Sequence, residues 1–245
     1  CLNMKNKSIT ILSQANNFLI TEYLEKLASR LACLGLDIHI ILADPTPAGK
    51  PISKIAVLRD MINLLGLKFG LIAIANYSKN VFLRTTAKLS SKYRVHTLKS
   101  SDNLDVDFLH RAKAPSSALL VLSGTRIIKK AVLDYFDGDV INVHSSILPY
   151  SRGVMPAYWT LKEKKGMGVS LFRLDEGIDT GELLRQVSIS EYSGSYYRYL
   201  KLTKSIGVDL LIFWVIDNIL PKSSHLKIKS TYNSYPATRN ILKKS

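Results

Sequence analysis

Cysteine, long apolar runs and blocks of like charge are all scarce in this chain of 245 residues. Its 2 cysteines, Cys1 and Cys33, are too few for a disulfide framework or a cluster of cysteine metal ligands. The two most apolar runs, residues 69–75 and 208–216, are far too short to cross a bilayer. No signal-like apolar segment follows the first lysines. These absences exclude a disulfide-stabilised secreted domain, and they predict a soluble cytoplasmic protein.

Positive charge is what the chain has in excess. Lys and Arg number 34 against 19 Asp and Glu, which gives a formal net charge of +15. Such an excess favours anionic partners: nucleic acid, nucleotide-linked substrates, polyglutamated cofactors or acidic membrane surfaces. The basic residues are scattered along the chain, so a solvated, lysine-rich surface explains them equally well. With 47% apolar residues, the chain has enough material for a substantial core.

The first half of the sequence alternates between segments of strand and helix character. Short apolar runs predict buried strands, and segments with apolar residues at helical spacing predict helices between them. The expected strands are residues 8–12, 38–43, 118–122 and 140–144. The expected helices are residues 21–34, 53–65, 102–111 and 127–136, with Thr21 and Asp102 as N-caps. This rhythm predicts an α/β fold, a Rossmann-like and mostly parallel sheet with helices on both faces.

The second half predicts a helix over residues 157–164, strands at 168–174 and 183–189, and a long apolar helix over 196–219. Residues 69–89 fit a helix, a strand followed by a helix, or a cap over the sheet. We predict a main domain over residues 1–190. Residues 191–245 then form a small C-terminal helical appendage and basic tail, within that domain or attached to it.

Two polar residues at the end of the strand over residues 140–144 stand out. Side chains two residues apart on a strand share a face, so Asn142 and His144 lie together near its carboxyl end. Ligands of parallel sheets gather beyond such ends. An amide and an imidazole there suit the stabilisation of a developing oxyanion. Taken alone, such a pair is more often an ordinary polar strand end.

The residues that follow carry a resemblance. Residues 142–159 read Asn-Val-His-Ser-Ser-Ile-Leu-Pro-Tyr-Ser-Arg-Gly-Val-Met-Pro-Ala-Tyr-Trp, and residues 168–181 read Gly-Val-Ser-Leu-Phe-Arg-Leu-Asp-Glu-Gly-Ile-Asp-Thr-Gly. Together they resemble the 10-formyltetrahydrofolate-dependent formyltransferases, a family with methionyl-tRNA, glycinamide ribonucleotide and sugar N-formyltransferases. That family's pattern is Asn-x-His-x-Ser-Leu-Leu-Pro with a following Arg-Gly, then Gly-Val-Thr-x-His and Asp-Glu-Gly-Ile-Asp-Thr-Gly. A weaker match at residues 123–128 extends the resemblance over residues 118–186.

The resemblance implies a formyltransferase fold and assigns site residues. The family's catalytic Asn, His and Asp fall on Asn142, His144 and Asp179. Its donor-binding segments fall on a second set: Arg126, Ile127, Ile128, Leu174, Asp175, Glu176 and Gly177. The implied donor is 10-formyltetrahydrofolate, and no metal is required. Asn142 and His144 would hold the formyl oxygen, while Asp179 would keep His144 charged and relay the proton that leaves the amine.

Three departures from the family pattern shape the predicted substrate. Phe172 stands where the family usually has a second His, which opens the alternative of a catalytically impaired folate-binding relative. Residues 13–16 replace the Gly-rich turn that binds the substrate phosphate in the purine enzyme, which argues against that activity. Too few residues follow Ile189 for the oligonucleotide-binding barrel of methionyl-tRNA formyltransferase.

The favoured acceptor is therefore a small anionic amine, with a nucleotide-linked amino sugar the best match. A tRNA or peptide formyltransferase without the barrel is the alternative, so nucleic acid is the less favoured partner. The sequence leaves the oligomeric state open, a homodimer included.

Overall fold

The computed structural model describes residues 7–14, 20–43, 81–99, 102–123, 127–153 and 155–219. The helices and strands within these ranges are, in chain order, β1 (Ser8–Gln14), α1 (Ile20–Cys33), β2 (Asp37–Ala43), α4 (Val81–Ser90), β3 (Arg94–Leu98), α5 (Val106–Arg111), β4 (Leu119–Val121), α6 (Lys130–Tyr135), β5 (Val140–His144), α7 (Pro156–Glu163), β6 (Gly168–Arg173), β7 (Leu183–Ser188) and α8 (Tyr196–Asn218).

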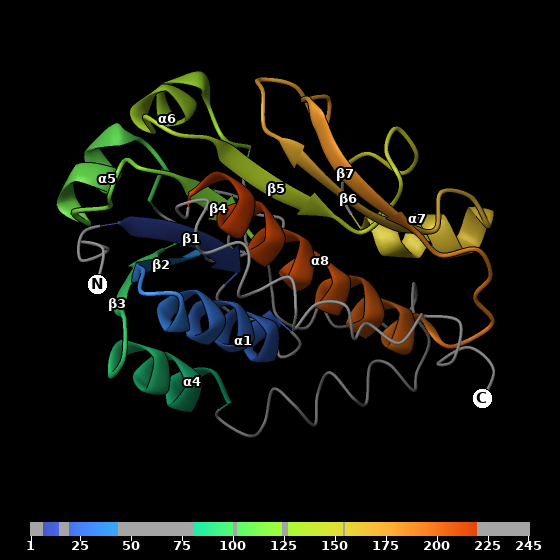
Figure 1. The fold of residues 1–245 in the computed structure, drawn as a ribbon, viewed down its shortest axis with the longest axis horizontal. Helices are drawn as coiled ribbons and strands as arrows, with labels where there is room; N and C mark the ends of the chain where they lie inside the picture. Colours follow the sequence, from blue (N-terminus) through green and yellow to red (C-terminus); the bar gives the residue numbers. More distant parts are fainter. Residues whose placement is uncertain are drawn as a thin grey trace.

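The described strands form one seven-stranded sheet in the order β3-β2-β1-β4-β5-β6-β7 (Figure 1). Strands β1 to β5 are parallel, whereas β6 runs antiparallel to β5, and β7 antiparallel to β6. The first three strands follow one another from β1 to β3 at one edge of the sheet. The next strand, β4, then pairs with the other side of β1. The strand order therefore reverses between β1 and β4, and open α/β sheets bind ligands at the carboxyl ends of the strands at such a point.

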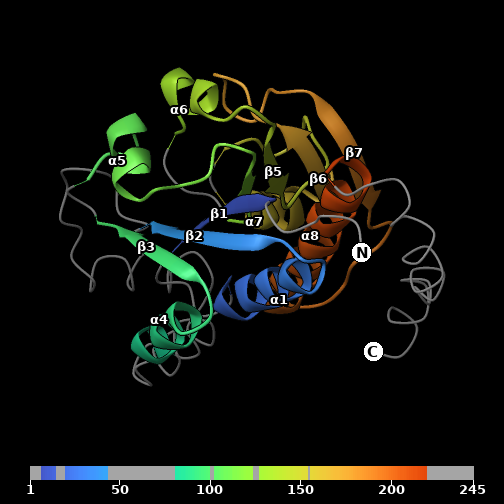
Figure 2. The same cartoon turned by 60° about the vertical axis from the view of Figure 1, so that its left-hand side comes forward.

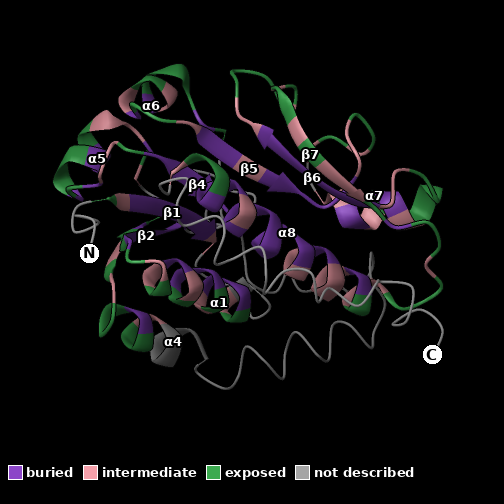
Figure 3. Cartoon of the chain, viewed as in Figure 1, coloured by how far each residue is buried: buried purple, intermediate pink, exposed green. Residues whose placement is uncertain are grey.

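Helices cover both faces of the sheet, as predicted (Figure 2). One core cluster joins α1 and α8 to Ile9 and Ile11 of β1. The other joins α5 and α6 to Leu12 of β1 and to Val121 of β4. The alternation of buried residues along β1 follows from the two-residue period of a strand that is covered on both sides. Figure 3 shows that burial is concentrated in these central strands and along α8.

Helix α8 packs against the sheet along much of its length. Gly207 lies against Val143 of β5, where an added Cβ would be 3.4 Å from the nearest valine methyl. The hydroxyl of Tyr199 accepts a hydrogen bond of 2.9 Å from the backbone N–H of Gly168. Asp209 pairs with Arg30 of α1 at 2.6 Å. These contacts place α8 in the same core as α1, while the domain boundary near residue 190 stays a prediction.

Several expected element boundaries differ from the observed ones. Helix α5 is capped by Asp105, whose Oδ1 accepts a hydrogen bond of 2.8 Å from the Phe108 N–H. The expected cap, Asp102, instead accepts a bond of 3.1 Å from the Lys99 N–H. Thr21 lies inside α1 rather than before it. Both capping predictions were therefore wrong, and for α5 the reason is that two aspartates lie close together in the sequence.

One observed strand was not predicted, and one predicted helix has no counterpart among the described residues. Strand β3 was not predicted, since most of its side chains are exposed or half-buried and its apolar signal is weak. The helix expected over residues 53–65 lies outside the described residues. Among the described helices, none is long and apolar enough to span a membrane.

Candidate active site

Strand β5 places Asn142 and His144 at the centre of the candidate site. Asn142 lies between Val121 of β4 and Phe172 of β6, and His144 lies opposite Ser170 of β6. Both side chains point away from the face that α8 covers, because Ile141 and Val143 occupy that face. The pair therefore sits near the carboxyl end of β5. Only β4 separates β5 from the point where the strand order reverses, which lies between β1 and β4.

Both ring nitrogens of His144 face oxygen atoms. Nε2 lies 2.8 Å from the Ser151 carbonyl oxygen. A carbonyl can only accept a hydrogen bond, so Nε2 carries a proton. Nδ1 lies 3.5 Å from Oδ2 of Asp179. In the neutral ring Nδ1 is the acceptor, and a proton gained by His144 would sit between Nδ1 and this carboxylate.

Asp179 is held by the loop that connects β6 to β7. Its backbone is left-handed, with φ of 51°, and its Oδ2 accepts a hydrogen bond of 2.8 Å from the Gly153 N–H. Asp175 braces the same loop, since its carboxylate accepts bonds from the Gly177 N–H at 3.0 Å and the Thr180 hydroxyl at 2.8 Å. The loop therefore aims Asp179 at His144 from a turn with its own internal hydrogen bonds.

Gly181 is required for the start of β7. An added Cβ would lie 1.8 Å from the Arg173 carbonyl oxygen, closer than atoms can approach. This close backbone contact explains the glycine that follows Asp179 and Thr180 in the motif.

Burial sets the protonation of His144. The side chain is 5% exposed, and desolvation lowers the pKa of His144 below its ordinary value of 6.5. The negative charge of Asp179 and the hydrogen bond to Ser151 raise this pKa, while the positive charge of Lys204 lowers it further. The net shift of this pKa is downward, so burial favours the neutral form of His144 in the free protein, while Asp179 acts in favour of the charged form that was expected.

Phe172 contributes to this apolar environment. It is fully buried, and its ring meets the His144 ring edge to face at 6.5 Å between centroids. An aromatic ring here can neither donate nor accept the hydrogen bonds that a second histidine would make. The substitution thus makes the surroundings of His144 more apolar.

Asn142 has an unused hydrogen-bonding group. Its Oδ1 is buried and has no hydrogen-bond partner among the described residues. Buried amides are seldom left unpaired, and unpaired ones often mark a place where a ligand binds. The side chain is therefore available to a bound molecule.

The two segments predicted to bind the donor lie beside each other. Leu174 packs against the core cluster that contains Ile128. The ion pair between Lys130 and Glu176, at 3.7 Å, joins the same two segments. Ile127 is 72% exposed at their surface. Asp175 and Gly177 are exposed in the adjoining loop. Arg126 lies outside the described residues.

Lys204 is a site residue that sequence reasoning missed. It extends from α8 and acts electrostatically on His144, although sixty residues of chain separate the two. The one available signal was a lysine within a helix that is otherwise rich in buried apolar residues.

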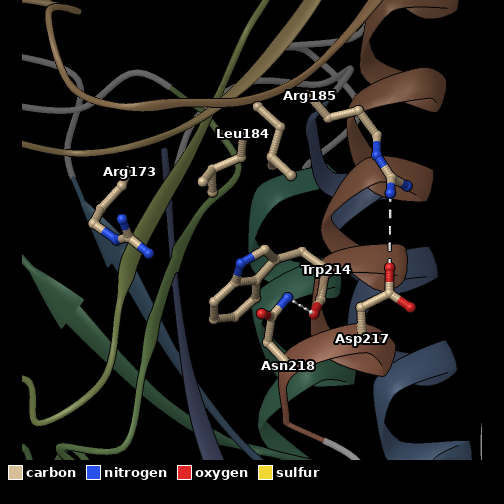
Figure 4. Close-up of a pocket in the computed structure, with 7 residues that line it drawn as sticks. Arg173, Leu184, Arg185, Trp214, Asp217 and Asn218 are labelled. Atoms are coloured by element: carbon tan, nitrogen blue, oxygen red, sulfur yellow. Dashed lines mark hydrogen bonds and ion pairs between the residues drawn. The ribbon is translucent and has the colours of Figure 1, made fainter.

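A separate pocket of about 190 Å³ lies between β6, β7 and the end of α8 (Figure 4). Its charged residues are paired. Arg185 faces Asp217 at 3.7 Å, and Arg173 makes two hydrogen bonds to Asp139. Arg173 pairs with Ile141 near the amino end of β5, whereas His144 lies at the carboxyl end of the same strand. This pocket is therefore distinct from the candidate site. No group of metal-ligating side chains occurs within the described ranges.

Comparison with known proteins identifies the family. The family described as Formyl transferase matches residues 75–193, which contain Asn142, His144, Asp179 and both donor segments. This part of the chain, slightly less than half of it, belongs to the formyltransferase family. The family resemblance drawn from the two sequence motifs is thereby confirmed.

Individual formyltransferases match only parts of the sequence. The methionyl-tRNA formyltransferase of Syntrophomonas wolfei is 29% identical over 136 residues, which cover 54% of this chain and 43% of that enzyme. The methionyl-tRNA formyltransferase of Syntrophus aciditrophicus is 33% identical over 129 residues, or 50% of this chain and 40% of that enzyme. The chain thus spans less than half the length of these curated relatives.

Solved formyltransferases share the fold. A sugar N-formyltransferase from Shewanella has a TM-score of 0.53 at 15% identity, covering 84% of this chain and 66% of its own. The match confirms the predicted formyltransferase fold, and at this identity it carries nothing about the acceptor.

The pH dependence of stability should report His39 and His144, the buried histidines among the described residues. Burial lowers the pKa of His144 and that of His39 in β2 below 6.5, their ordinary value. The unfolded chain then binds more protons than the folded chain in the range just below that value. The free energy of unfolding should therefore be retained above pH 6.5 and fall as the pH drops below it.

Urea unfolding at pH 7.5 and pH 5.5 measures this loss, and the double variant His39→Gln/His144→Gln should reduce it. His110→Gln, on the exposed side of α5, is the matched control and should lose as much stability as the wild type. An undiminished loss in the double variant would contradict the assignment.

Proposed function

We propose that this protein transfers the formyl group of 10-formyltetrahydrofolate to a primary amine. The observation that carries the proposal is the position of the Asn142 side chain, whose buried Oδ1 has no hydrogen-bond partner among the described residues, on the same strand face as His144 and its partner Asp179. These groups meet at the carboxyl edge of the sheet, where a ligand can reach donor, acceptor and charged groups at once.

The donor would bind along the two neighbouring segments that carry the exposed Ile127 and the half-buried Leu174. An apolar surface beside exposed backbone suits a flat heterocycle with polar edges. Residues Asp175, Glu176 and Gly177 would enclose it from the loop. Ile128 supports the segment from the core, and Arg126 belongs to the same proposed set. When bound, the donor supplies an activated formyl carbon, and the protein supplies orientation and electrostatics.

Each catalytic side chain then has a role that its contacts support. Asn142 would donate an N–H to the formyl oxygen as negative charge grows on it, which contributes about 3 kcal/mol for a well-placed donor. His144 is neutral, and its Nδ1 can accept the proton that the attacking amine loses. The same proton can then pass to the donor nitrogen as its bond to the formyl carbon breaks, which releases tetrahydrofolate. Asp179, beside Nδ1, stabilises the imidazolium that forms. Nε2 of His144 donates its hydrogen bond to the Ser151 carbonyl oxygen, so any contact of His144 with the formyl group would be made through Nδ1.

The proposed acceptor is a small anionic amine, with a nucleotide-linked amino sugar the best candidate. The net charge of +15 supports an anionic acceptor but fits RNA equally well. The second candidate is the amino group of an aminoacyl-tRNA, favoured by the methionyl-tRNA formyltransferases among the relatives.

The test mixes the protein with 10-formyltetrahydrofolate and a panel of nucleotide-linked amino sugars, and follows the release of tetrahydrofolate. Release with at least one sugar supports the proposal, and binding of the donor without release from any amine would favour the impaired relative. Salt separates the two acceptor classes, because affinity for a tRNA falls steeply with ionic strength and affinity for a small nucleotide falls weakly.

A further inference from the structure

Two oxygen atoms compete for the one ring proton of neutral His144. The Ser151 carbonyl oxygen lies 2.8 Å from Nε2, and Oδ2 of Asp179 lies 3.5 Å from Nδ1. A hydrogen bond to a carboxylate is charge-assisted, so at equal distances Asp179 would draw the proton onto Nδ1. The form with its proton on Nε2 therefore depends on how closely the Ser151 carbonyl is held to the ring.

The turn that contains Ser151 has a backbone conformation that needs support. The φ of Ser151, 52°, lies in the left-handed region, which a serine adopts less readily than a glycine. The preceding carbonyl, that of Tyr150, accepts a hydrogen bond of 2.6 Å from the buried hydroxyl of Ser146. Further along the turn, the Gly153 N–H donates to Oδ2 of Asp179. This short turn therefore sets the positions of both oxygen atoms that face the imidazole.

Thr160 joins this turn to helix α7, which lies beyond the carboxyl end of β5 (Figure 1). The residue is fully buried, and its hydroxyl donates a hydrogen bond of 3.2 Å to the hydroxyl of Ser151. A threonine hydroxyl inside a helix commonly bonds to a carbonyl of the preceding turn of its own helix. Here the bond connects α7 to the residue whose carbonyl holds the His144 ring.

We propose that Thr160 is a positioning residue for His144. Its bond to Ser151 holds the Ser151 carbonyl against Nε2, which keeps the ring proton there and leaves Nδ1 as the acceptor. Without this bond the turn would relax, and the ring proton would move in part to Nδ1, beside Asp179. A ring that is protonated on Nδ1 cannot accept the proton of an amine at that atom, so transfer would slow. This last step rests on the proposed function.

The test is an NMR measurement of the ring nitrogens of His144 in the whole chain, at a pH above 7 and without donor or amine. In the wild type, Nε2 should give the signal of a protonated nitrogen and Nδ1 that of an unprotonated one. We expect Thr160→Val, which has nearly the same shape but no hydroxyl, to bring the two signals closer together. Thr160→Ser keeps the hydroxyl and should restore the wild-type spectrum.

Thr10→Val is the matched control. Thr10 is also fully buried, and its hydroxyl donates a hydrogen bond of 3.2 Å to the Pro115 carbonyl, near the amino end of β1. This variant should lower the melting temperature about as much as Thr160→Val does, and it should leave the His144 signals unchanged. With a reacting amine, Thr160→Val should lower kcat by about threefold to tenfold, the range for one lost neutral hydrogen bond, with KM unchanged.

Ser151→Ala decides the case if Thr160→Val does not fold. It removes the same hydrogen bond from the other side and keeps the carbonyl, so it should change the His144 signals in the same way. The double variant should be no worse than either single variant, because both changes remove one bond. Wild-type ring signals in Thr160→Val or Ser151→Ala, or an equal change in Thr10→Val, would overturn the positioning role.

These results separate the positioning role from the proposed function. Ring signals that change as expected in a protein with no formyl transfer would uphold the role of Thr160 and overturn the function. Formyl transfer by a protein whose variants keep the wild-type signals would do the reverse.

Discussion

The Asp179→Asn variant is expected to transfer formyl groups about 10³-fold more slowly than the wild type, within the range of general acid–base effects. The asparagine can still accept the hydrogen bond from the Gly153 N–H, so the loop keeps its shape. It removes the negative charge beside Nδ1 of His144, the one group that acts to raise the pKa of this ring through charge. The imidazolium that forms as the amine loses its proton is then destabilised.

Steady-state rates of tetrahydrofolate release measure this effect with any acceptor that reacts. Asp107→Asn, an exposed carboxylate on α5, is the matched control and should keep the wild-type rate. Unfolding temperatures should agree among all three proteins within a few degrees. An Asp179→Asn enzyme that matches the wild type on every reacting amine would remove Asp179 from the mechanism.

Replacing Asn142 with alanine should lower kcat by about 10² to 10³-fold, the usual cost of removing one oxyanion donor. The same change should leave stability unchanged or slightly raised, because Oδ1 of Asn142 is buried and makes no hydrogen bond within the described residues. Loss of activity without loss of stability is the signature of a side chain that the substrate uses and that contributes little to the fold.

Two further variants sharpen this prediction. Asn142→Asp keeps the shape and removes the donor, so it should be impaired as severely as the alanine variant. Asn218→Ala removes an asparagine at the far end of α8, where its side chain bonds to the Trp214 carbonyl, and should retain full activity. Equal rates for wild type and Asn142→Ala would refute the role of the amide.

The parts of the fold that sequence predicted best are those with strong local signals. Strand β5 was predicted with its observed bounds, since a short apolar run between turns has few alternatives. The edge strand β3 was missed because, apart from Leu98, its side chains are exposed or half-buried, so its apolar signal is weak. The cap of α5 was misplaced because two aspartates three residues apart offer the same local chemistry, and only the observed hydrogen bonds distinguish them.

By itself, the sequence predicted the amide, the imidazole and the carboxylate of the candidate site, but not the ammonium group of Lys204. The strand period puts Asn142 and His144 on one face, and the motif around Asp179 supplies the carboxylate. Only the tertiary structure decided the electrostatic state of these groups. The low pKa of His144 depends on burial beside Phe172 and on the charge of Lys204 from α8, and these contributions come from segments that are distant in the chain. Desolvation and charge interactions depend on distances in space, which periodicity and motifs do not specify.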